Sequence, residues 1–264
     1  MNFSFGIPLP PDYNTAMLQS LVNSIQYQPF AEGDQFEILT CGGDYRDDLR
    51  LKDGVRFRHI LFNEHEKPKW ITKKKNEIVQ HSQYANVCIL HDYYKLGAGW
   101  YDGLNKCQQE HNDWDVLCSP IYTYEQERHS DWLVNQKYMD MILKKYPELE
   151  TELLDAAPTE ENGARWVCGL PYSENELSHI QYVSGGYIFA KRVVFEEVPF
   201  DERYVWGEAP EDIIWSEQVI KMGFKIRLNR YSTLWLQKPG KWHTYTMTDS
   251  CIEKLKEMFP CEEL

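Results

Sequence analysis

Long apolar runs are missing from this 264-residue sequence. A helix that crosses a bilayer needs about 20 consecutive, mostly apolar residues, and no stretch of the sequence approaches that length. The first residues, MNFSFGIPLPPDY, also lack the basic region and the apolar region of a secretory signal. We therefore expect a cytoplasmic protein without an integral membrane segment.

Basic residues are scarce. The 28 Lys and Arg residues are outnumbered by 41 Asp and Glu residues, which gives a formal net charge of −13. Proteins that bind nucleic acid need a basic surface, so we expect no nucleic-acid partner. An anionic ligand would need a local source of positive charge, such as a Lys, a helix N-terminus or a metal ion. The one basic cluster, KPKWITKKK at residues 67–75, is either such a source or a solvated helix face.

Cysteine pairs with redox or zinc spacing are also absent. The seven cysteines form no C-x-x-C pair, and several lie in apolar stretches such as NVCIL and DVLCSP. This pattern favours buried, reduced thiols. The sequence has no repeats and no Gly/Ser-rich linker, so we expect a single domain over residues 1–264. The 9 Trp and 17 Tyr residues suit either a core or a sugar-binding cleft.

What the sequence does contain is an alternation of amphipathic stretches and short apolar runs. The stretches TAMLQSLVNSIQ and ITKKKNEIVQH predict helices over residues 15–26 and 71–81. The short apolar runs between such helices predict strands of about five to seven residues. Short strands that alternate with helices indicate an α/β fold with a mixed, mainly parallel central sheet flanked by helices. Residues 121–179 are less regular and are interpreted as a helical insertion or flap. The apolar runs predict strands at 3–9, 36–40, 55–62, 85–90 and 114–118, and regular structure resumes at 180–190, 224–228 and 232–236.

The ends of these predicted strands are the places to look for a ligand. In mainly parallel sheets, ligands bind beyond the carboxyl ends of the strands. This rule directs attention to Pro8 and Leu9, to residues 42–44 with Asp44, and to residues 91–94.

The sequence HDYY after the fourth predicted strand carries the strongest chemical signal of the first half. Asp92 is either a turn residue or an oxygen ligand for a divalent cation that bridges phosphates. His91 and Tyr93 are placed to contact a ribose or a base. Lys75 and Asn76, on the preceding predicted helix, are expected to bring a cation and an amide to the same edge of the sheet.

The second half contains a pair of acids in YVWGEAPEDIIW, residues 204–215. Glu211 and Asp212 lie where a helix is expected to begin, behind Trp206 and Gly207. Acids are favoured in the first turn because they meet the positive end of the helix dipole, so the pair could be purely structural. The other interpretation is that one of them accepts a proton from a substrate.

Taken in order, these pieces resemble glycosyltransferases of the GT-A fold, most closely the family 2 group. The Lys75-Asn76 pair is similar to the (R/K)-N of that group, and HDYY occupies the place of its D-x-D. VSGGYIF at 183–189 resembles the small-residue stretch under the donor sugar and acceptor. WGEAPEDIIWSEQ at 206–218 resembles the W-G-x-x-x-E-D element that is clearest in β-1,4-galactosyltransferase-like enzymes. The resemblance covers residues 1–120 and 180–245.

The resemblance implies a division of labour along the chain. Residues 1–120 would bind the nucleotide-sugar donor, a UDP- or GDP-sugar, and residues 180–264 would supply the acceptor and catalytic half. The acceptor would be a glycan or another hydroxyl compound. Pro8, Leu9 and Asp44 would contact the donor together with Lys75, Asn76, His91, Asp92 and Tyr93.

The same resemblance assigns roles in the second half. Asp212 would be the general base and Glu211 would bind acceptor or donor hydroxyls, although the reverse assignment stays open. Gly185 and Gly186 would lie under the sugars. Trp206 and Gly207 would shape the acceptor pocket, with Glu208 as a lesser candidate for the base.

The metal site departs from the family pattern. D-x-D is reduced to Asp92, because neither Tyr93 nor Tyr94 replaces a carboxylate as a metal ligand. Some relatives supply a His from the C-terminal segment, and His243 lies about where it would be expected. His243 is either a ligand for Mn²⁺ or Mg²⁺ or an ordinary histidine.

Three functions remain as alternatives. The first is an inverting glycosyltransferase with Asp212 as general base; retention also stays open because fold alone does not set stereochemistry. The second is a nucleotide-sugar or carbohydrate-binding protein of the same fold that has lost catalysis. The third is a glycoside hydrolase built on Glu208, Glu211 and Asp212, which is disfavoured because acids so close on one helix start rarely oppose each other across a sugar.

Overall fold

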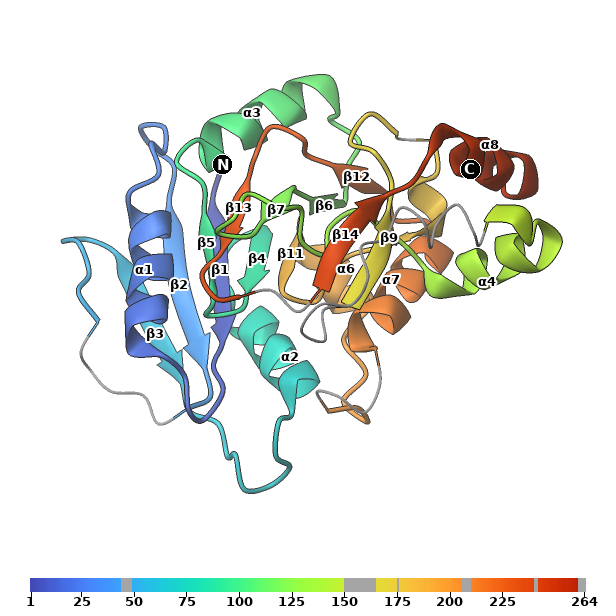
Figure 1. Ribbon diagram of the computed structural model, residues 1–264. Coiled ribbons are helices and arrows are strands. Elements are labelled where there is room, and N and C mark those ends of the chain that lie inside the picture. Colours follow the sequence, from blue (N-terminus) through green and yellow to red (C-terminus); the bar gives the residue numbers. More distant parts are fainter. Residues whose placement is uncertain (44–48, 150–164, 175, 206–209, 240–241, 261–264) are drawn as a thin grey trace.

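A seven-stranded sheet forms the centre of the computed structural model, which describes residues 1–43, 49–149, 165–174, 176–205, 210–239 and 242–260 (Figure 1). β11 runs antiparallel to β4 and β6, and the other neighbouring strands are parallel. The predicted mixed, mainly parallel sheet is therefore confirmed. In spatial order the strands are β12 (Ile226–Leu228), β6 (Val116–Cys118), β11 (Tyr187–Lys191), β4 (Asn86–Leu90), β1 (Phe3–Pro8), β2 (Phe36–Cys41) and β3 (Arg56–Ile60).

Helices cover both faces of this sheet because its central strands are apolar on both sides. In β4, Val87 and Ile89 enter one core cluster while Cys88 and Leu90 enter the other, as the alternation of side chains along a strand requires. On one face pack α1 (Thr15–Gln26) and α3 (Trp100–Glu110). On the other pack α2 (Ile71–His81), α6 (Arg192–Glu197) and α7 (Glu211–Lys221).

The two predicted helices have the bounds that their apolar spacing indicated. The α1 helix begins after Asn14, whose side chain accepts a hydrogen bond from the N–H of Met17. The α2 helix lies close to β1, because a Cβ at Gly6 would be 2.1 Å from Cγ2 of Ile78. Glycine in β1 thus sets the distance between this helix and the sheet.

Two smaller sheets lie beside the central one. The first contains β10 (Gln181–Tyr182), β8 (Leu133–Val134), β9 (Arg165–Gly169) and β14 (Trp242–Thr246), and the second contains β5 (Tyr94–Leu96), β13 (Leu234–Leu236) and β7 (Ile121–Tyr122). Residues 121–179, interpreted as a helical insertion or flap, therefore contribute strands as well as α4 (Gln136–Lys145) and the short helix η1 (Ser178–Ile180). Strands of two residues are too short to show the alternation that would predict them.

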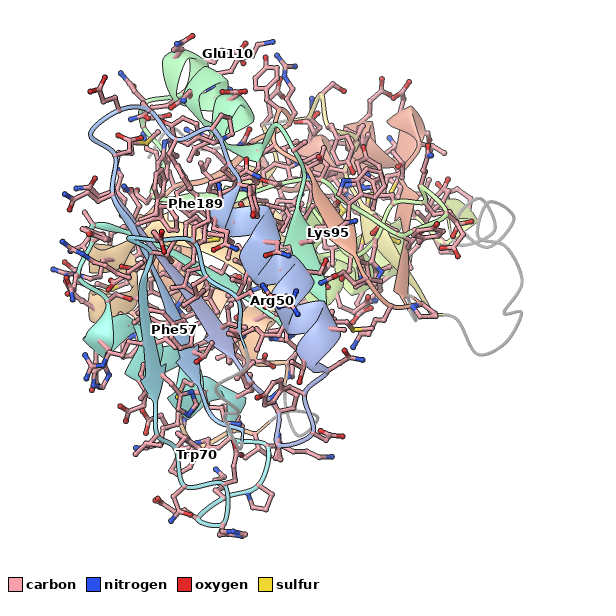
Figure 2. The ribbon with its side chains drawn as sticks, turned by 90° about the vertical axis from the view of Figure 1, so that its left-hand side faces the viewer. Arg50, Phe57, Trp70, Lys95, Glu110 and Phe189 are labelled. Atoms are coloured by element: carbon pink, nitrogen blue, oxygen red, sulfur yellow. The ribbon has the colours of Figure 1, made fainter. Side chains whose placement is uncertain are left out.

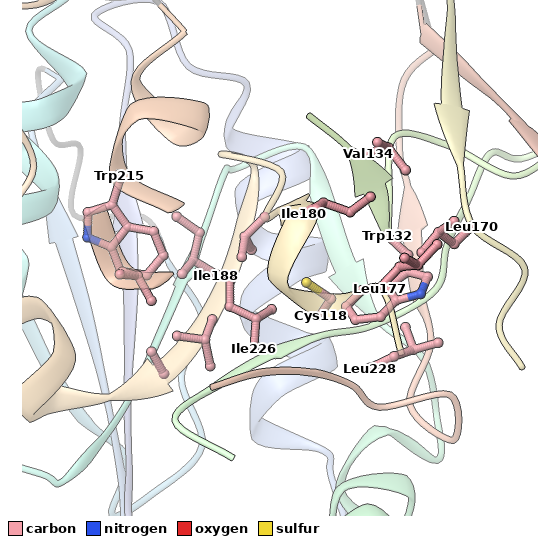
Figure 3. Packing of buried hydrophobic residues seen from close by; sticks show 14 of the residues in the cluster. Cys118, Trp132, Val134, Leu170, Leu177, Ile180, Ile188, Trp215, Ile226 and Leu228 are labelled. Carbon is pink, nitrogen blue, oxygen red and sulfur yellow. The ribbon is translucent and has the colours of Figure 1, made fainter. Parts of the chain in front are cut away.

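The largest core cluster joins the central sheet to the sheet of β8–β10 and β14. Figure 3 shows Trp215 at one end of this cluster and Trp132 with Leu170 at the other. The ring of Trp215 stacks on Phe195 and Phe200, with centroids 5.2 Å away from each, and its Nε1 donates to the carbonyl oxygen of Val198. These contacts fix α7, and with it the position of the Glu211–Asp212 pair. The C-terminal helix α8 (Asp249–Met258) packs on the same cluster.

Two expectations about the whole chain can be compared with the described ranges. Within them, no helix combines the length and the apolar character that a bilayer crossing requires. Six of the seven cysteines fall in the described part, and five of these six are buried.

Candidate active site

The end of β4 and the loop before β11 meet at the carboxyl edge of the central sheet. β4 ends at Leu90, and the N–H of His91 donates to the carbonyl oxygen of Gly186 at 3.0 Å. Residues 91–94 and 184–186, which are far apart in sequence, therefore lie side by side. The structure thus brings together two segments that carry five of the predicted site residues: His91, Asp92, Tyr93, Gly185 and Gly186.

Close packing explains the two glycines. A Cβ at Gly186 would lie 2.4 Å from Cε2 of Tyr94, which no real side chain tolerates. A Cβ at Gly185 would lie 3.1 Å from Oε1 of Glu211 and 3.2 Å from Cβ of Asp212. Gly186 therefore admits the tyrosine ring, and Gly185 admits the two acids of α7.

Asp212 is held at the start of α7 by backbone donors. Its Oδ2 accepts a hydrogen bond from the N–H of Gly185, and its Oδ1 accepts one from the N–H of Ile213, both at 2.9 Å. Burial raises the pKa of the Asp212 carboxyl and the charge of Glu211 raises it further, against the opposing effects of the two hydrogen bonds and of Lys75. A fixed carboxylate with a raised pKa is suited to general-base catalysis.

Lys75 lies on the interior side of the acid pair. Its side chain is fully buried, and its Nζ donates to the carbonyl oxygen of Gly185 at 3.0 Å. The same Nζ is 3.3 Å from Oε1 of Glu211 and 4.8 Å from the centroid of the Phe200 ring. The sequence predicted a contact with the donor, whereas the structure gives this ammonium partners inside the protein.

His91 and Tyr93 form a second polar group at the end of β4. Nδ1 of His91 and the hydroxyl of Tyr93 share a hydrogen bond of 2.7 Å, and Nε2 of His91 is buried without a hydrogen-bond partner among the described residues. Burial lowers the pKa of His91 well below its usual value, and the charges of Lys75 and Lys238 lower it further. These effects all favour the neutral form of the ring. Nζ of Lys238 lies 3.3 Å from the centroid of the Tyr93 ring.

Asp92 faces the loop between β1 and α1. Its side chain is buried, and burial raises the pKa of its carboxyl. The charge of Lys238 and a hydrogen bond from the backbone of Asn14 act in the opposite direction, while the charge of Asp12 adds to the rise. Asp92 and Lys238 thus provide charges of both signs near Tyr93.

The described residues do not assemble a metal site around Asp92. In this part of the chain, no three His, Cys, Asp or Glu side chains are grouped closely enough to hold a metal ion. A divalent cation prefers several oxygen ligands, and Asp92 is the carboxylate that the sequence predicted for it. The backbone of His243 lies in β14 opposite Trp166, but its side chain is outside the described set. Metal binding stays a prediction.

Of the other predicted site residues, Pro8 and Leu9 are described by the structure and several others are not. Pro8 ends β1, and the buried Leu9 follows it, with its carbonyl oxygen accepting a hydrogen bond from Nζ of Lys74 at 2.7 Å. Both residues lie at the predicted edge of the sheet. The predictions for Asp44, Trp206, Gly207 and Glu208 fall outside the described residues.

Asn76 is not brought to the acid pair. Its Oδ1 accepts a hydrogen bond from the N–H of Phe200 and its Nδ2 donates to the carbonyl oxygen of the same residue, both at 2.9 Å. Nδ2 also lies 3.0 Å from Oε1 of Glu202. Asn76 lines a separate cavity of about 570 Å³ between α2 and α6, together with Phe195 and Glu196.

The basic cluster binds the segment that leads towards α7. Nζ of Lys67, Nε1 of Trp70 and Oγ1 of Thr72 donate to carbonyl oxygens of residues 202–204 at 2.6–3.2 Å. Trp70 lies on the loop before α2, at the lower end of the molecule in Figure 2. This cluster is not a purely solvated face, because these three donors are used within the protein. A contact between the cluster and an anionic ligand stays a prediction.

Sequence reasoning missed three residues near the candidate site. Burial raises the pKa of the Tyr182 and Tyr94 phenols, and the charge of Asp212 adds to the rise in both, after the larger effect of Asp131 on Tyr94. Tyr94 lies in the HDYY sequence, where it does not replace a carboxylate ligand, and Tyr182 directly precedes the VSGG stretch. Lys238 carried no signal, because its segment comes close to β4 only through the pairing of β13 with β5.

The fold and this edge define an α/β protein with an acidic pair, two close-packed glycines and a buried lysine beyond the central strands. The crystal structure of S. aureus TarS 1-349 is similar to this chain, with a TM-score of 0.50 and 10% sequence identity over 98% of this chain and 64% of that chain. That likeness shows a shared fold.

Other TarS structures give similar values. The crystal structure of S. aureus TarS matches with a TM-score of 0.49 and 10% identity over 98% of this chain and 39% of that one. TarS 1-349 in complex with UDP-GlcNAc matches with a TM-score of 0.48 and 10% identity over 96% and 61%. This chain thus spans less than two thirds of the length of these TarS chains. No protein-family model matches the sequence, and no curated protein matches it.

Proposed function

We propose that this protein is a glycosyltransferase that moves a sugar from a nucleoside-diphosphate donor to a hydroxyl of a glycan or another acceptor, with inversion. The observation that supports this most strongly is the position of Asp212. Its carboxylate is fixed by Gly185 at the carboxyl edge of the sheet, where α/β proteins bind ligands. The end of β4, with Asp92 and Tyr93, lies next to the same loop.

The proposed chemistry divides between the two segments. The acceptor hydroxyl attacks the anomeric carbon and gives its proton to Asp212, while the nucleoside diphosphate leaves from the opposite face of the sugar. The leaving diphosphate gains negative charge, which needs a positive partner. Lys238, next to Tyr93 and Asp92, is a candidate for that partner. We expect Glu211 and the phenols of Tyr94 and Tyr182 to contact sugar hydroxyls.

The donor is proposed to be a UDP- or GDP-sugar. A divalent cation, Mn²⁺ or Mg²⁺, remains part of the proposal only as a factor to test, because the described residues do not gather its ligands. A thermal-shift series with UDP- and GDP-sugars, including UDP-GlcNAc, identifies the donor. The same series with Mn²⁺ or with EDTA shows whether binding depends on a metal.

The assigned base is tested with Asp212→Asn. Without a group that accepts the proton, kcat/KM for transfer should fall by about 10²–10⁴-fold, while the Kd of the donor should change only a few-fold. Glu217→Gln is the matched control on the same helix, because Glu217 bonds to Asn135 and Lys137 instead of Gly185. Full transfer activity in Asp212→Asn would remove the base from the mechanism.

A donor that binds without turnover would favour the second candidate, a binding protein of the same fold. The departure from D-x-D, which leaves Asp92 alone, is the observation behind it. Release of the nucleoside diphosphate from bound donor, with or without an acceptor, separates an enzyme from such a binding protein.

A further inference from the structure

Lys75 is the cation that joins the two acids to the loop before β11. Its Nζ contacts the carbonyl oxygen of Gly185 and Oε1 of Glu211, while the N–H of Gly185 donates to Oδ2 of Asp212. Gly185 therefore carries Lys75 on its carbonyl side and Asp212 on its amide side. The three side chains surround one peptide segment.

Because Lys75 is buried, its ammonium group depends on the partners that surround it inside the protein. Its side chain is 0% exposed, whereas that of Glu211 is 11% exposed. Transfer of an ammonium out of water costs several kcal/mol unless a charged partner and hydrogen bonds compensate it. Glu211 and the Gly185 carbonyl are the polar partners of Nζ that the structure describes, with the face of Phe200 nearby. A ligand would have to displace these groups to reach Nζ.

Neighbouring lysines of α2 do not share this role. Nζ of Lys73 pairs with Glu202 at 3.3 Å on a partly exposed surface. Nζ of Lys74 bonds to the carbonyl oxygen of Leu9 and pairs with Glu64. Lys75 is thus the member of the KKK run that reaches the acid pair, and Lys73 provides a matched control on the same helix.

We propose that Lys75 is a positioning residue that neutralises Glu211 and fixes Gly185, so that Asp212 is the acid of the pair that takes the proton of the acceptor. This inference rests on the proposed function and changes the role that the sequence suggested for Lys75. It also separates the two acids, which sequence reasoning left open. Glu211 is the paired ion, and Asp212 is held by backbone N–H groups without a cation in direct contact among the described residues.

The charges around Asp212 and Glu211 determine in which direction the loss of Lys75 changes the pKa of Asp212. Asp212 is faced by Glu211 on its own helix, by Lys75 on α2, and by the neutral phenols of Tyr93, Tyr94 and Tyr182. Lys75 is the cation in this set, and two adjacent carboxylates without a cation hold one proton more tightly. Loss of Lys75 should therefore raise the pKa of Asp212 further and keep this base protonated at higher pH.

The test is the pH profile of Lys75→Met, an uncharged side chain of similar length. The acidic limb of kcat/KM should move to higher pH by about one to three units, the range that one opposite charge at this distance controls. KM for the donor should change little, because the proposal gives the ammonium of Lys75 to Glu211 and Gly185 and not to the donor. Lys73→Met should keep the wild-type limb. An unshifted limb in Lys75→Met, or a loss confined to donor KM, would overturn the proposal.

A second measurement does not depend on activity. The difference in unfolding midpoint between wild type and Lys75→Met should be large at neutral pH and should shrink as pH falls and the acids become protonated. The charge-balanced variant Lys75→Met/Glu211→Gln should recover the midpoint at neutral pH, and it replaces the single variant if that fails to fold. A midpoint difference that is independent of pH, with no recovery in the double variant, would refute the pairing. If the pairing holds but no donor is turned over, the proposed function fails and Lys75 remains the counter-ion of the acids.

Discussion

Gly186 is a glycine for reasons of packing and not of backbone conformation. Its missing Cβ would lie 2.4 Å from Cε2 and 2.9 Å from the hydroxyl oxygen of Tyr94, a buried side chain that cannot swing into solvent. At Gly185 the shortest such distance is 3.1 Å, and it involves the end of the Glu211 side chain. Gly186 therefore has no space for a Cβ, whereas Gly185 has space for one after a small shift of its neighbours.

Alanine substitutions should reveal this difference. Gly186→Ala forces the Tyr94 ring out of place and should lower the free energy of unfolding by about 1–3 kcal/mol, as overpacking does. Gly185→Ala should cost less, because Glu211 can shift by a few tenths of an ångström. Urea unfolding of both variants shows which substitution lowers the free energy of unfolding more. Equal costs, or additive effects of Gly186→Ala and Tyr94→Leu in a double-mutant cycle, would show that the ring is not the obstacle.

At the scale of elements, α2 contacts both the acid pair at the start of α7 and the segment that precedes α7. One side of the helix directs Lys75 to Glu211 and Gly185, and the next residue, Asn76, is directed to the backbone of Phe200. Residues 67–72 bind the carbonyl oxygens of 202–204. The helix and the segment that precedes α7 are therefore one packed unit.

The role of Asn76 can be separated from donor binding. Asn76→Ala removes the partners of the buried Phe200 N–H and carbonyl, at about 1–3 kcal/mol for each unsatisfied group. Chemical denaturation should show this loss, while donor affinity at a temperature where the variant is folded should stay within a few-fold. Gln80→Ala, one turn further along α2 at an exposed position, is the control. A stable variant with poor donor binding would restore the role that the sequence suggested.

This helix also shows what the sequence could and could not predict. The apolar spacing predicts the bounds of α2 and the presence of the central strands, because periodicity follows directly from burial on one or both faces. The order of the strands in the sheet did not follow from it. The direction of each polar side chain did not follow. Lys75 and Asn76 are adjacent, yet their partners lie on different segments, and no local pattern distinguishes them. Long-range pairing placed Lys238 and Tyr182 at the site, which the sequence alone could not show.

At the scale of the whole molecule, the central sheet separates two core clusters that share its strands. Ile89 and Leu90 are adjacent in β4, both are 0% exposed, and they point to opposite faces. Because β4 contributes side chains to both clusters, its unfolding removes residues from both. The two clusters should therefore lose their packing in the same transition. The prediction of a single domain over residues 1–264 can be tested on this pair.

Ile89→Ala and Leu90→Ala should each lower the free energy of unfolding by about 2–5 kcal/mol, the usual cost of such a truncation in a packed core. In a single domain both variants shift the same urea transition, and tryptophan fluorescence and far-UV circular dichroism report one midpoint for each. Leu61→Ala, at a position 89% exposed, should leave the midpoint almost unchanged. Two transitions, one sensitive to Ile89→Ala and the other to Leu90→Ala, would mean that the faces of the sheet unfold separately. Shared strands make that outcome physically costly, because the face left behind would expose the apolar side of β4 to water.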